Sequence, residues 1–270
     1  MNSKSCRSRW LLGAACMALP MGGFAAGFAA GISPSKFELR ARPGQVLRDT
    51  LTIFNTADAG ADFQFRTADW RLDETSSVEF FDDMLLEGSC RPWVRLERKT
   101  VRIESGLQKK YRFEVHVPED AEPGLCRFAI LIEPAETYQV NVDGAMSIPI
   151  VGRYAVVTYV TIGDAAADIE YFGMGAHAAN GGRLPTLKLR NQGATYDRAF
   201  GRVTATDGEG RRIGLVPSSF PVLPGRSEEI PLQREAAVDE SSAEPLAYPL
   251  TIKGRIEIGG DTIEIDELFE

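Results

Sequence analysis

The stretch LRDTLTIFN at residues 47–55 decides the fold class of this chain. Apolar residues such as Leu51 and Ile53 alternate along it with polar ones. Successive side chains of a β-strand point to opposite faces of a sheet, so this period of two predicts a strand with one buried face. The turn formers at 43–44 precede the stretch and the run NTADAG at 55–60 follows it, which bounds the strand on both sides.

The same pattern recurs along the chain, and helix signals are nearly absent. The other segments with strand character are 36–40, 63–67, 93–96, 100–103, 110–117, 126–132, 148–151, 154–162, 168–172, 184–191, 199–206, 211–216, 229–232, 248–258 and 262–265. Many short strands separated by turn residues predict an all-β sandwich. Within this series the glycine-rich stretch 173–182 predicts a loop, and Gly259-Gly260 predicts the turn of a closing hairpin.

A short polar stretch divides the strand pattern into two units. Residues 163–168 (GDAAAD) have no strand pattern, and the alternation restarts after them. We therefore predict two tandem immunoglobulin-like β-sandwich domains, at residues 30–163 and 168–270.

A faint internal repeat supports two copies of one fold. LTIFN at 51–55 matches LKLRN at 187–191, and each of these strands ends at an asparagine. ESG at 104–106 matches LPG at 223–225, each of which precedes a further strand. Because the matching segments keep their order, tandem sandwiches are favoured over one large barrel.

Residues 1–29 have the organisation of a cleaved secretory signal peptide. Their basic residues are Lys4, Arg7 and Arg9, and an apolar run from Trp10 to Leu19 follows. That run is shorter than the roughly 20 residues that cross a bilayer. Small residues then offer cleavage after Ala25, Ala26 or Ala29. A lipoprotein processed at Cys16 is the alternative, although Gly13 stands where a lipobox has leucine.

The remaining chain is acidic. The full sequence has 30 Lys and Arg against 38 Asp and Glu, a net charge of −8, and loss of the three signal-peptide bases brings it to −11. Phosphate backbones are bound by clustered Lys and Arg, so nucleic acid is not an expected partner. No later apolar run is long enough for a membrane span, so no stable membrane insertion is expected.

Two cysteines remain after the signal peptide, Cys90 and Cys126. Thiols of exported proteins pair in oxidising compartments, so we predict one structural disulfide. Closing this 36-residue loop is worth roughly 3–4 kcal/mol in the chain-entropy model. Two isolated cysteines lack the ligand spacing of a zinc site, and no metal site is predicted.

Signals for catalysis are weak. His116 and His177 are the only histidines, and neither accompanies a nucleophile motif such as GxSxG or a metal motif such as HExxH. We therefore predict no enzyme activity, no catalytic residue and no cofactor. An acidic cluster, Asp73, Glu74, Glu79, Asp82 and Asp83, is either a calcium loop or a solvated surface. Its spacing does not fit an EF-hand, which favours the solvated surface.

Several motifs resemble the periplasmic fimbrial and pilus assembly chaperones (PapD-like) and their relatives. The first unit carries ISP at 32–34, PG at 43–44, Trp70 and WVRL at 93–96, and the second carries LRNQG at 189–193 and VLPG at 222–225. The resemblance covers nearly the whole chain after the signal peptide. It implies a location in the periplasm, with the cell surface as the alternative. Trp70 and Trp93 are favoured as core residues over a ligand platform.

The resemblance also implies a mode of binding. In that family an edge strand of the first domain pairs with an extended segment of a pilin, and basic residues in the cleft hold the pilin's terminal carboxylate. The matching strand here is 147–162. The partner-binding residues that the resemblance implies are Arg153, Lys36, Ile148, Ile150, Tyr154 and Val156. Arg153 is either a carboxylate anchor or an ordinary surface residue, and the apolar residues either bind the partner or pack in the core.

A departure from the family pattern points to a divergent member. Lys36 and Arg40 lie on the first strand, without the family's usual motif around such a basic residue. The expected partner is therefore a pilin-like subunit or another envelope or surface subunit, and an outer-membrane usher is a further candidate. The alternative is a structural adaptor or stalk at the cell envelope that has no folding activity.

Overall fold

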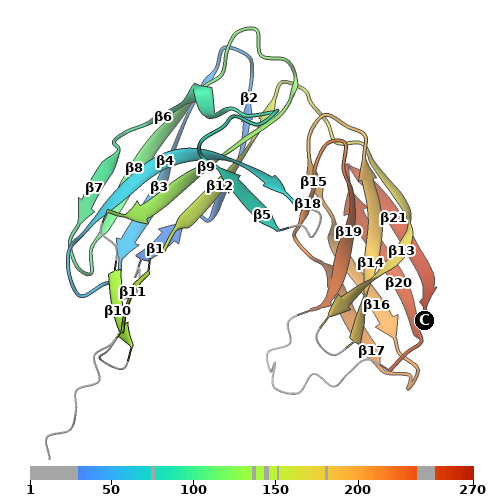
Figure 1. Cartoon of the computed structure of the whole chain (residues 1–270). Coiled ribbons are helices and arrows are strands. Elements are labelled where there is room, and N and C mark those ends of the chain that lie inside the picture. Colours follow the sequence, from blue (N-terminus) through green and yellow to red (C-terminus); the bar gives the residue numbers. More distant parts are fainter. Residues whose placement is uncertain are drawn as a thin grey trace, which may run out of the picture.

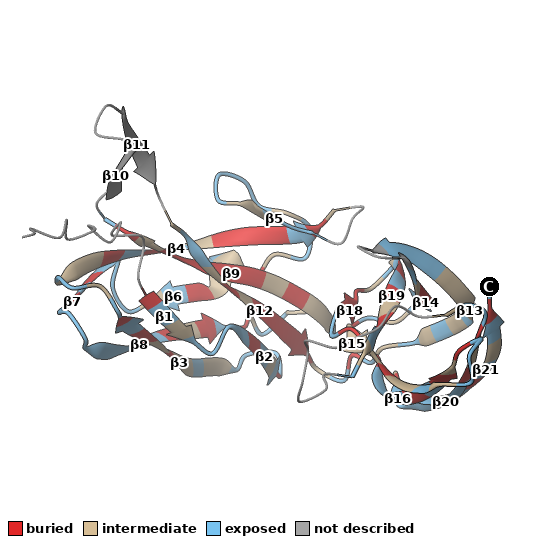
Figure 2. Cartoon of the chain, turned by 90° about the horizontal axis from the view of Figure 1, so that it is seen from below, coloured by how far each residue is buried: buried red, intermediate tan, exposed pale blue. Residues whose placement is uncertain are grey.

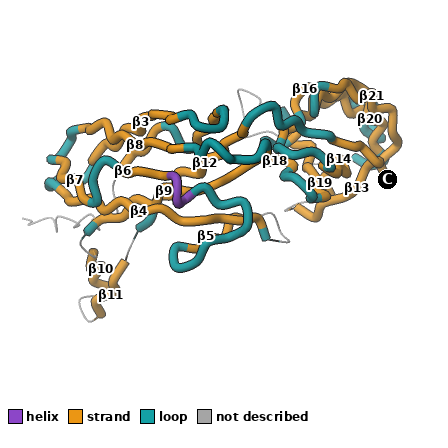
Figure 3. Tube along the Cα trace, turned by 90° about the horizontal axis from the view of Figure 1, so that it is seen from above, coloured by secondary structure: helices purple, strands orange, loops and turns teal. Residues whose placement is uncertain are grey.

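The structure is a computed structural model that describes residues 30–73, 77–135, 138–142, 146–150, 152–179, 182–235 and 247–270. The predicted signal peptide, residues 1–29, lies outside the described residues. The described chain is built from β-strands with one short 3₁₀ turn, η1 (Arg91–Trp93), as Figure 3 shows. Two stacks of sheets stand side by side like the legs of an arch (Figure 1). The predicted all-β class with two immunoglobulin-like sandwiches is confirmed; the residue limits of the domains stay a prediction.

The first sandwich packs a four-stranded sheet against a six-stranded one. The four-stranded sheet has the order β1 (Ala30–Ser33), β3 (Val46–Asn55), β8 (Gln108–His116) and β6 (Val94–Leu96). The other has the order β2 (Lys36–Ala41), β12 (Tyr154–Ile162), β9 (Gly124–Pro134), β4 (Ala61–Leu72) and β5 (Val78–Phe81), with β7 (Thr100–Ile103) paired to β4. The chain therefore changes sheets between β1 and β2.

The alternation in the sequence places the core of the first sandwich. Leu51 and Ile53 of β3 are fully buried, as are Phe113 and Val115 of β8 opposite the other sheet. Figure 2 shows the buried residues running along β9 and β12. Burying an apolar side chain of this size stabilises the fold by about 1.5–3 kcal/mol, so these strands hold the two sheets together.

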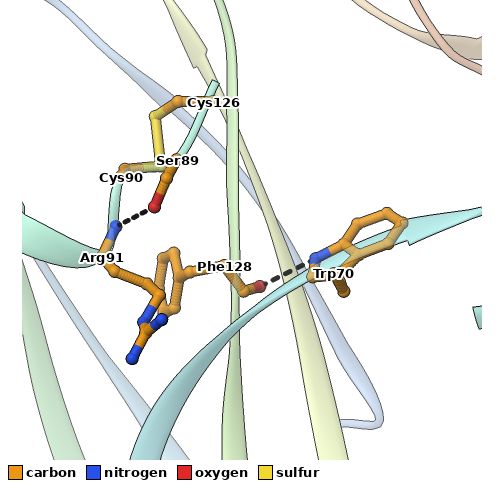
Figure 4. Close-up of a disulfide and its surroundings, with 6 residues drawn as sticks. All are labelled: Trp70, Ser89, Cys90, Arg91, Cys126 and Phe128. Carbon is orange, nitrogen blue, oxygen red and sulfur yellow. Dashed lines mark hydrogen bonds between the residues drawn. A yellow bond between two sulfur atoms is a disulfide. The ribbon is translucent and has the colours of Figure 1, made fainter. Parts of the chain in front are cut away.

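The predicted disulfide is confirmed and lies beside this core. Cys90 and Cys126 are bonded with their Cα atoms 5.4 Å apart, and both side chains are buried (Figure 4). The bond ties the segment before η1 to β9. Arg91 donates its backbone N–H to Ser89 Oγ at 3.2 Å, which shapes the turn next to the bond.

The second sandwich is built on a curved seven-stranded sheet. Its order is β13 (Ile169–Ala179), β14 (Gly182–Asn191), β19 (Ser227–Arg234), β17 (Arg212–Pro217), β16 (Phe200–Thr206), β20 (Leu250–Ile258) and β21 (Asp261–Phe269), with the small pair β15 (Asp197–Arg198) and β18 (Pro221–Val222) beside it. Side chains from β13 and from β21 pack on one apolar cluster, so the sheet curves around its core. The hairpin around Gly259-Gly260 is confirmed.

The expected loop at 173–182 is wrong. The chain there forms the hairpin of β13 and β14, whose register shifts between Tyr171 and Met174. Gly173 has a φ of 116° at this shift, a conformation that glycine adopts without the steric cost of a Cβ. Gly173 thus accommodates an irregularity within the strand instead of ending it.

The two asparagines of the sequence repeat occupy equivalent corners. Asn55 donates its side-chain N–H groups to the carbonyls of Ala59 and Ile103, both at 2.9 Å. Asn191 donates to the carbonyls of Thr195 and Val222, both at 2.8 Å. Both asparagines are fully buried.

The glycines of the repeat complete these corners. Gly106 and Gly225 each donate a backbone N–H to the carbonyl of the corner asparagine, at 3.0 and 2.9 Å. Their φ angles are 70° and 72°. The repeat is therefore structural, and its asparagines are kept by their side-chain hydrogen bonds rather than by turn conformation alone.

Candidate functional site

A hairpin projects from the end of the first sandwich that is farthest from the second (Figure 1). It consists of β10 (Tyr138–Val142) and β11 (Met146–Ile150), which pair antiparallel with Val140 opposite Ile148. β10 follows β9 and β11 precedes β12, and these two strands are themselves paired. The hairpin therefore lies between β9 and β12 in the chain, and its two strands form a small sheet of their own beyond the body of the sandwich. Ile148 and Ile150 belong to β11, but their side chains lie outside what the structure describes.

The structure differs from the single edge strand expected over 147–162. β12 lies inside its sheet, between β2 and β9. β2 pairs with it in parallel from Val157 to Ile162, because the chain changes sheets after β1 and brings β2 alongside. From Tyr154 to Val156, the only strand that pairs with β12 within the described residues is β9. We name β11 together with the start of β12 up to Val156 the open edge, since within the described residues no second strand lies along it.

The two β12 side chains expected to bind a partner have different surroundings. Val156 is 1% exposed and packs in the core of the first sandwich. Tyr154 is 36% exposed, and its hydroxyl donates to the carbonyl of Ala30 at 2.6 Å. Val156 thus fits the packing alternative, because its side chain is turned away from any partner, and Tyr154 stays accessible.

Arg153 lies just before β12, at the head of a row of charges. It forms an ion pair with Glu133 of β9, and Glu133 also holds Arg66 at 2.9 Å. Arg66 in turn contacts Asp82 at 2.6 Å. The Arg153 side chain is 44% exposed. Exposed ion pairs are worth at most about 1 kcal/mol, so a carboxylate on a bound partner could compete with Glu133 for this guanidinium.

Lys36 lies at the start of β2, opposite Val157 of β12. Its ammonium group contacts Glu38 at 2.8 Å, and Glu38 also forms an ion pair with Arg198 of the second sandwich. Partial burial opposes ionisation of Glu38, but the hydrogen bond from Lys36 and the positive charge of Arg198 outweigh it and lower the pKa of Glu38 below its ordinary value. Glu38 thus links the two sandwiches as a carboxylate.

Lys36 and Arg153 do not converge on one point. Phe37 packs in the core, so its neighbour Lys36 faces the opposite side of the sheet, where Arg153 meets Glu133. Arg153 comes four residues before Val157, the residue opposite Lys36. Four residues of strand span about 13 Å. The two cations therefore lie at two places along one sheet face.

The same sheet face forms the contact with the second sandwich, which sequence reasoning missed. Trp70 is 2% exposed and donates Nε1–H to the carbonyl of Phe128 at 3.0 Å (Figure 4). Its ring meets the ring of Tyr159 edge-on at 5.1 Å, and Tyr159 packs on Tyr196 of the second sandwich at 4.4 Å. The guanidinium of Arg198 lies 5.0 Å and 4.9 Å from the centres of these two tyrosine rings. Trp70 is confirmed as a core residue, but the cluster to which it belongs bridges two units, and the sequence carries no signal for that.

Three of the residues considered for metal binding, Asp73, Glu79 and Asp82, have other partners. Glu79 pairs with Arg71 at 2.8 Å and Asp82 with Arg66 at 2.6 Å. Asp73 accepts the backbone N–H of Ser77 at 2.9 Å. Glu74 lies outside the described residues. Over the described residues no three acidic, histidine or cysteine side chains gather as metal ligands would.

The histidines are on the surface of separate strands. His116 at the end of β8 contacts Glu114 at 2.8 Å, and His177 lies in β13 opposite Leu184.

No helix among the described residues has the length and apolar character needed to cross a bilayer.

Comparison with known proteins returns likenesses of structure. No family model matches the chain, and no curated protein does. The Class 5 fimbriae chaperone CfaA is 12% identical with a TM-score of 0.45, over 82% of this chain and 99% of that chain. The CsuC-CsuE chaperone–tip adhesion subunit complex from the archaic chaperone-usher Csu pili of Acinetobacter baumannii is 14% identical, TM-score 0.43, over 88% and 97%. The SafB chaperone in complex with the Salmonella enterica SafA pilin is 14% identical, TM-score 0.44, over 89% and 97%.

Proposed function

We propose that this chain is a non-catalytic, chaperone-like protein of the periplasm. Its partner is a pilus subunit or another envelope subunit, and an extended segment of that subunit adds as a strand to the open edge. The observation that carries the proposal is that β2 pairs with β12 only from Val157 onward, so that the start of β12 and the projecting β11 before it lie outside that pairing. The sequence resemblance to periplasmic pilus chaperones supports the same mode.

Strand addition fits the open edge for a physical reason. A strand with one paired side offers a row of backbone donors and acceptors to an incoming chain. Beyond Val157 that row is used by β2, whose exposed residues Lys36, Glu38 and Arg40 are charged. Charged residues on an edge strand discourage further pairing. The fold thus protects one part of the edge and leaves another available.

Hydrogen exchange tests the proposed mode. We expect a strand-deficient pilin-class subunit to slow amide exchange in residues 146–156 by at least about tenfold, because an added strand hydrogen-bonds these amides. Exchange should stay unchanged in β2, the edge strand next to the site, and in β21, an edge strand of the second sandwich. Protection confined to β21 or to β6 would contradict the proposal.

Substitution of Arg153 tests the predicted carboxylate anchor. We expect Arg153→Glu to weaken capture of the same subunit by about 10- to 100-fold, the equivalent of one lost charge-assisted hydrogen bond. Arg48→Glu is the matched control, because Arg48 is 70% exposed, pairs with Glu114 at 2.8 Å and lies on the other sheet. Capture that is equal for both variants would remove the anchor role of Arg153 and leave strand addition in place.

A rigid adaptor or stalk is the second candidate. The bridging contacts of Glu38 with Arg198 and of Tyr159 with Tyr196 favour it, since they fix the two sandwiches against each other. An adaptor binds subunits that are already folded, whereas a chaperone keeps a strand-deficient subunit from aggregating. Light scattering of that subunit with and without this protein separates the two: only a chaperone lowers the scattering.

A further inference from the structure

A pocket lies between the two sandwiches, away from the open edge. It has a volume of about 220 Å³ and is lined by Arg71, Leu72, Leu125, Arg127, Leu223 and Arg226, among others. The first four come from β4 and β9, and the last two from the loop between β18 and β19. Pockets for drug-sized ligands measure about 300–1,000 Å³. This one is the size for a compact group with a few waters.

The named lining is strongly cationic, with three guanidinium groups and no carboxylate. Arg71 forms an ion pair with Glu79 at 2.8 Å, and Glu79 is not part of the pocket lining. Arg226 donates Nε–H to Glu228 at 2.9 Å and Nη2–H to the carbonyl of Asp73 at 3.1 Å. Its Nη1 group is not used by these bonds, so Arg226 keeps donors for a ligand.

Arg127 is the unusual member of the three. Its guanidinium lies 5.0 Å from the centre of the Trp70 ring, and no carboxylate in the described part of the chain lies within ion-pair distance of it. Burial is the main reason why the pKa of Arg127 falls below its ordinary value. The nearby Arg226 acts in the same direction, while Tyr159 and the Asp69 carboxylate act against both. A half-buried cation beside another cation is costly unless an anion joins them.

We propose that this pocket binds a compact oxyanion, a phosphate or a carboxylate group, held between Arg127 of the first sandwich and Arg226 of the second. Planar guanidinium groups match such oxygens with paired hydrogen bonds. The bound group would join Arg127 and Arg226, which carry like charges on the two sides of the pocket, and so add to the contacts that fix the two sandwiches against each other. The proposal does not depend on strand capture at the open edge.

Titration of the purified chain without its signal peptide tests the site. At constant ionic strength, inorganic phosphate should bind and raise the melting temperature, with chloride as the reference ion. Arg127→Gln should weaken phosphate binding by about 10- to 100-fold, because a charge-assisted contact is lost. Arg226→Gln, a change in the other sandwich, should act in the same direction and guards against a folding defect of the first variant. Arg255→Gln should bind like the parent, since Arg255 is 73% exposed and pairs with Glu264.

Two further arms identify the source of the oxyanion. A short peptide with a free terminal carboxylate is compared with its amide, each in competition with phosphate. Competition by the acid alone shows a carboxylate site that a polypeptide can fill, and competition by neither shows a site for the free ion. The proposal is overturned if the parent chain binds neither phosphate nor the peptide acid, or if Arg127→Gln binds both as the parent does. Hydrogen exchange with the pilin-class subunit is repeated on Arg127→Gln. Slowed exchange at 146–156 in this variant shows that strand capture is intact, so a failure of the oxyanion site is distinguished from a failure of strand capture.

Discussion

Asn55→Ala is expected to lower the free energy of unfolding of the first sandwich by about 3–5 kcal/mol. The amide of Asn55 donates to the carbonyls of Ala59 and Ile103 and accepts the backbone N–H of Ala57 at 3.0 Å. Alanine would leave these backbone groups without their partner in a fully buried position. Each buried group that loses its hydrogen bond costs about 1–3 kcal/mol. Urea denaturation followed by tryptophan fluorescence gives the change, because Trp70 and Trp93 both belong to the first sandwich.

The second corner supplies the comparison. Asn191→Ala should destabilise the second sandwich by a similar amount, because its bonds to Thr195 and Val222 are equivalent. Gln192→Ala is the control: the side chain is exposed, and its amide bonds to Glu170 at 3.2 Å. Exposed substitutions of this kind stay within about 0.5 kcal/mol. A loss below about 1 kcal/mol for Asn55→Ala would show that the corner keeps its geometry without the amide.

Removal of the Cys90–Cys126 bond is expected to cost the first sandwich about 4 kcal/mol. The bond closes a loop with a sequence separation of 36 residues, and the loss follows from the larger entropy of the unfolded chain. The double variant Cys90→Ala/Cys126→Ala should therefore unfold at lower urea, with the transition of the second sandwich unchanged. Two separate transitions must be fitted, because a chain of two units need not unfold in one step.

Reducing the disulfide chemically gives an independent measurement of the stability that it contributes. Dithiothreitol should shift the parent protein toward the double variant and leave the variant itself unchanged, since the only other cysteines, Cys6 and Cys16, lie in the predicted signal peptide. If the reductant moves both proteins equally, the shift does not come from this disulfide. If neither the variant nor the reductant changes stability by more than about 1 kcal/mol, the loop is held by packing alone.

The strands that could be predicted are those whose side chains alternate. Tyr111, Phe113, Val115 and Val117 take alternate positions in the predicted strand 110–117, and all four are buried. The stretch 173–182 could not be predicted in the same way, because glycine carries no side chain to mark a period. Its strand character depends on pairing with β14, a contact that the local sequence does not encode.

The candidate site also has a part that could be predicted from the sequence and a part that could not. The row of residues near Arg153 could be predicted to form a strand, but its neighbours could not. β2 covers β12 from Val157 onward only because the chain changes sheets after β1. The pocket of Arg71, Arg127 and Arg226 has no local signal at all, because its residues are separated by up to 155 positions and come from two sandwiches.

The sequence by itself determined the all-β class, the two-unit organisation, the disulfide and the paired asparagine corners. These follow from side-chain period, turn chemistry and cysteine count, which act over a few residues or on the composition of the whole chain. Tertiary structure alone decided which part of β12 stays open, how Trp70 and Tyr159 meet the second sandwich, and where three arginines surround one pocket. Those features arise from contacts between segments far apart in the chain, and such contacts exist only once both sandwiches have folded and met.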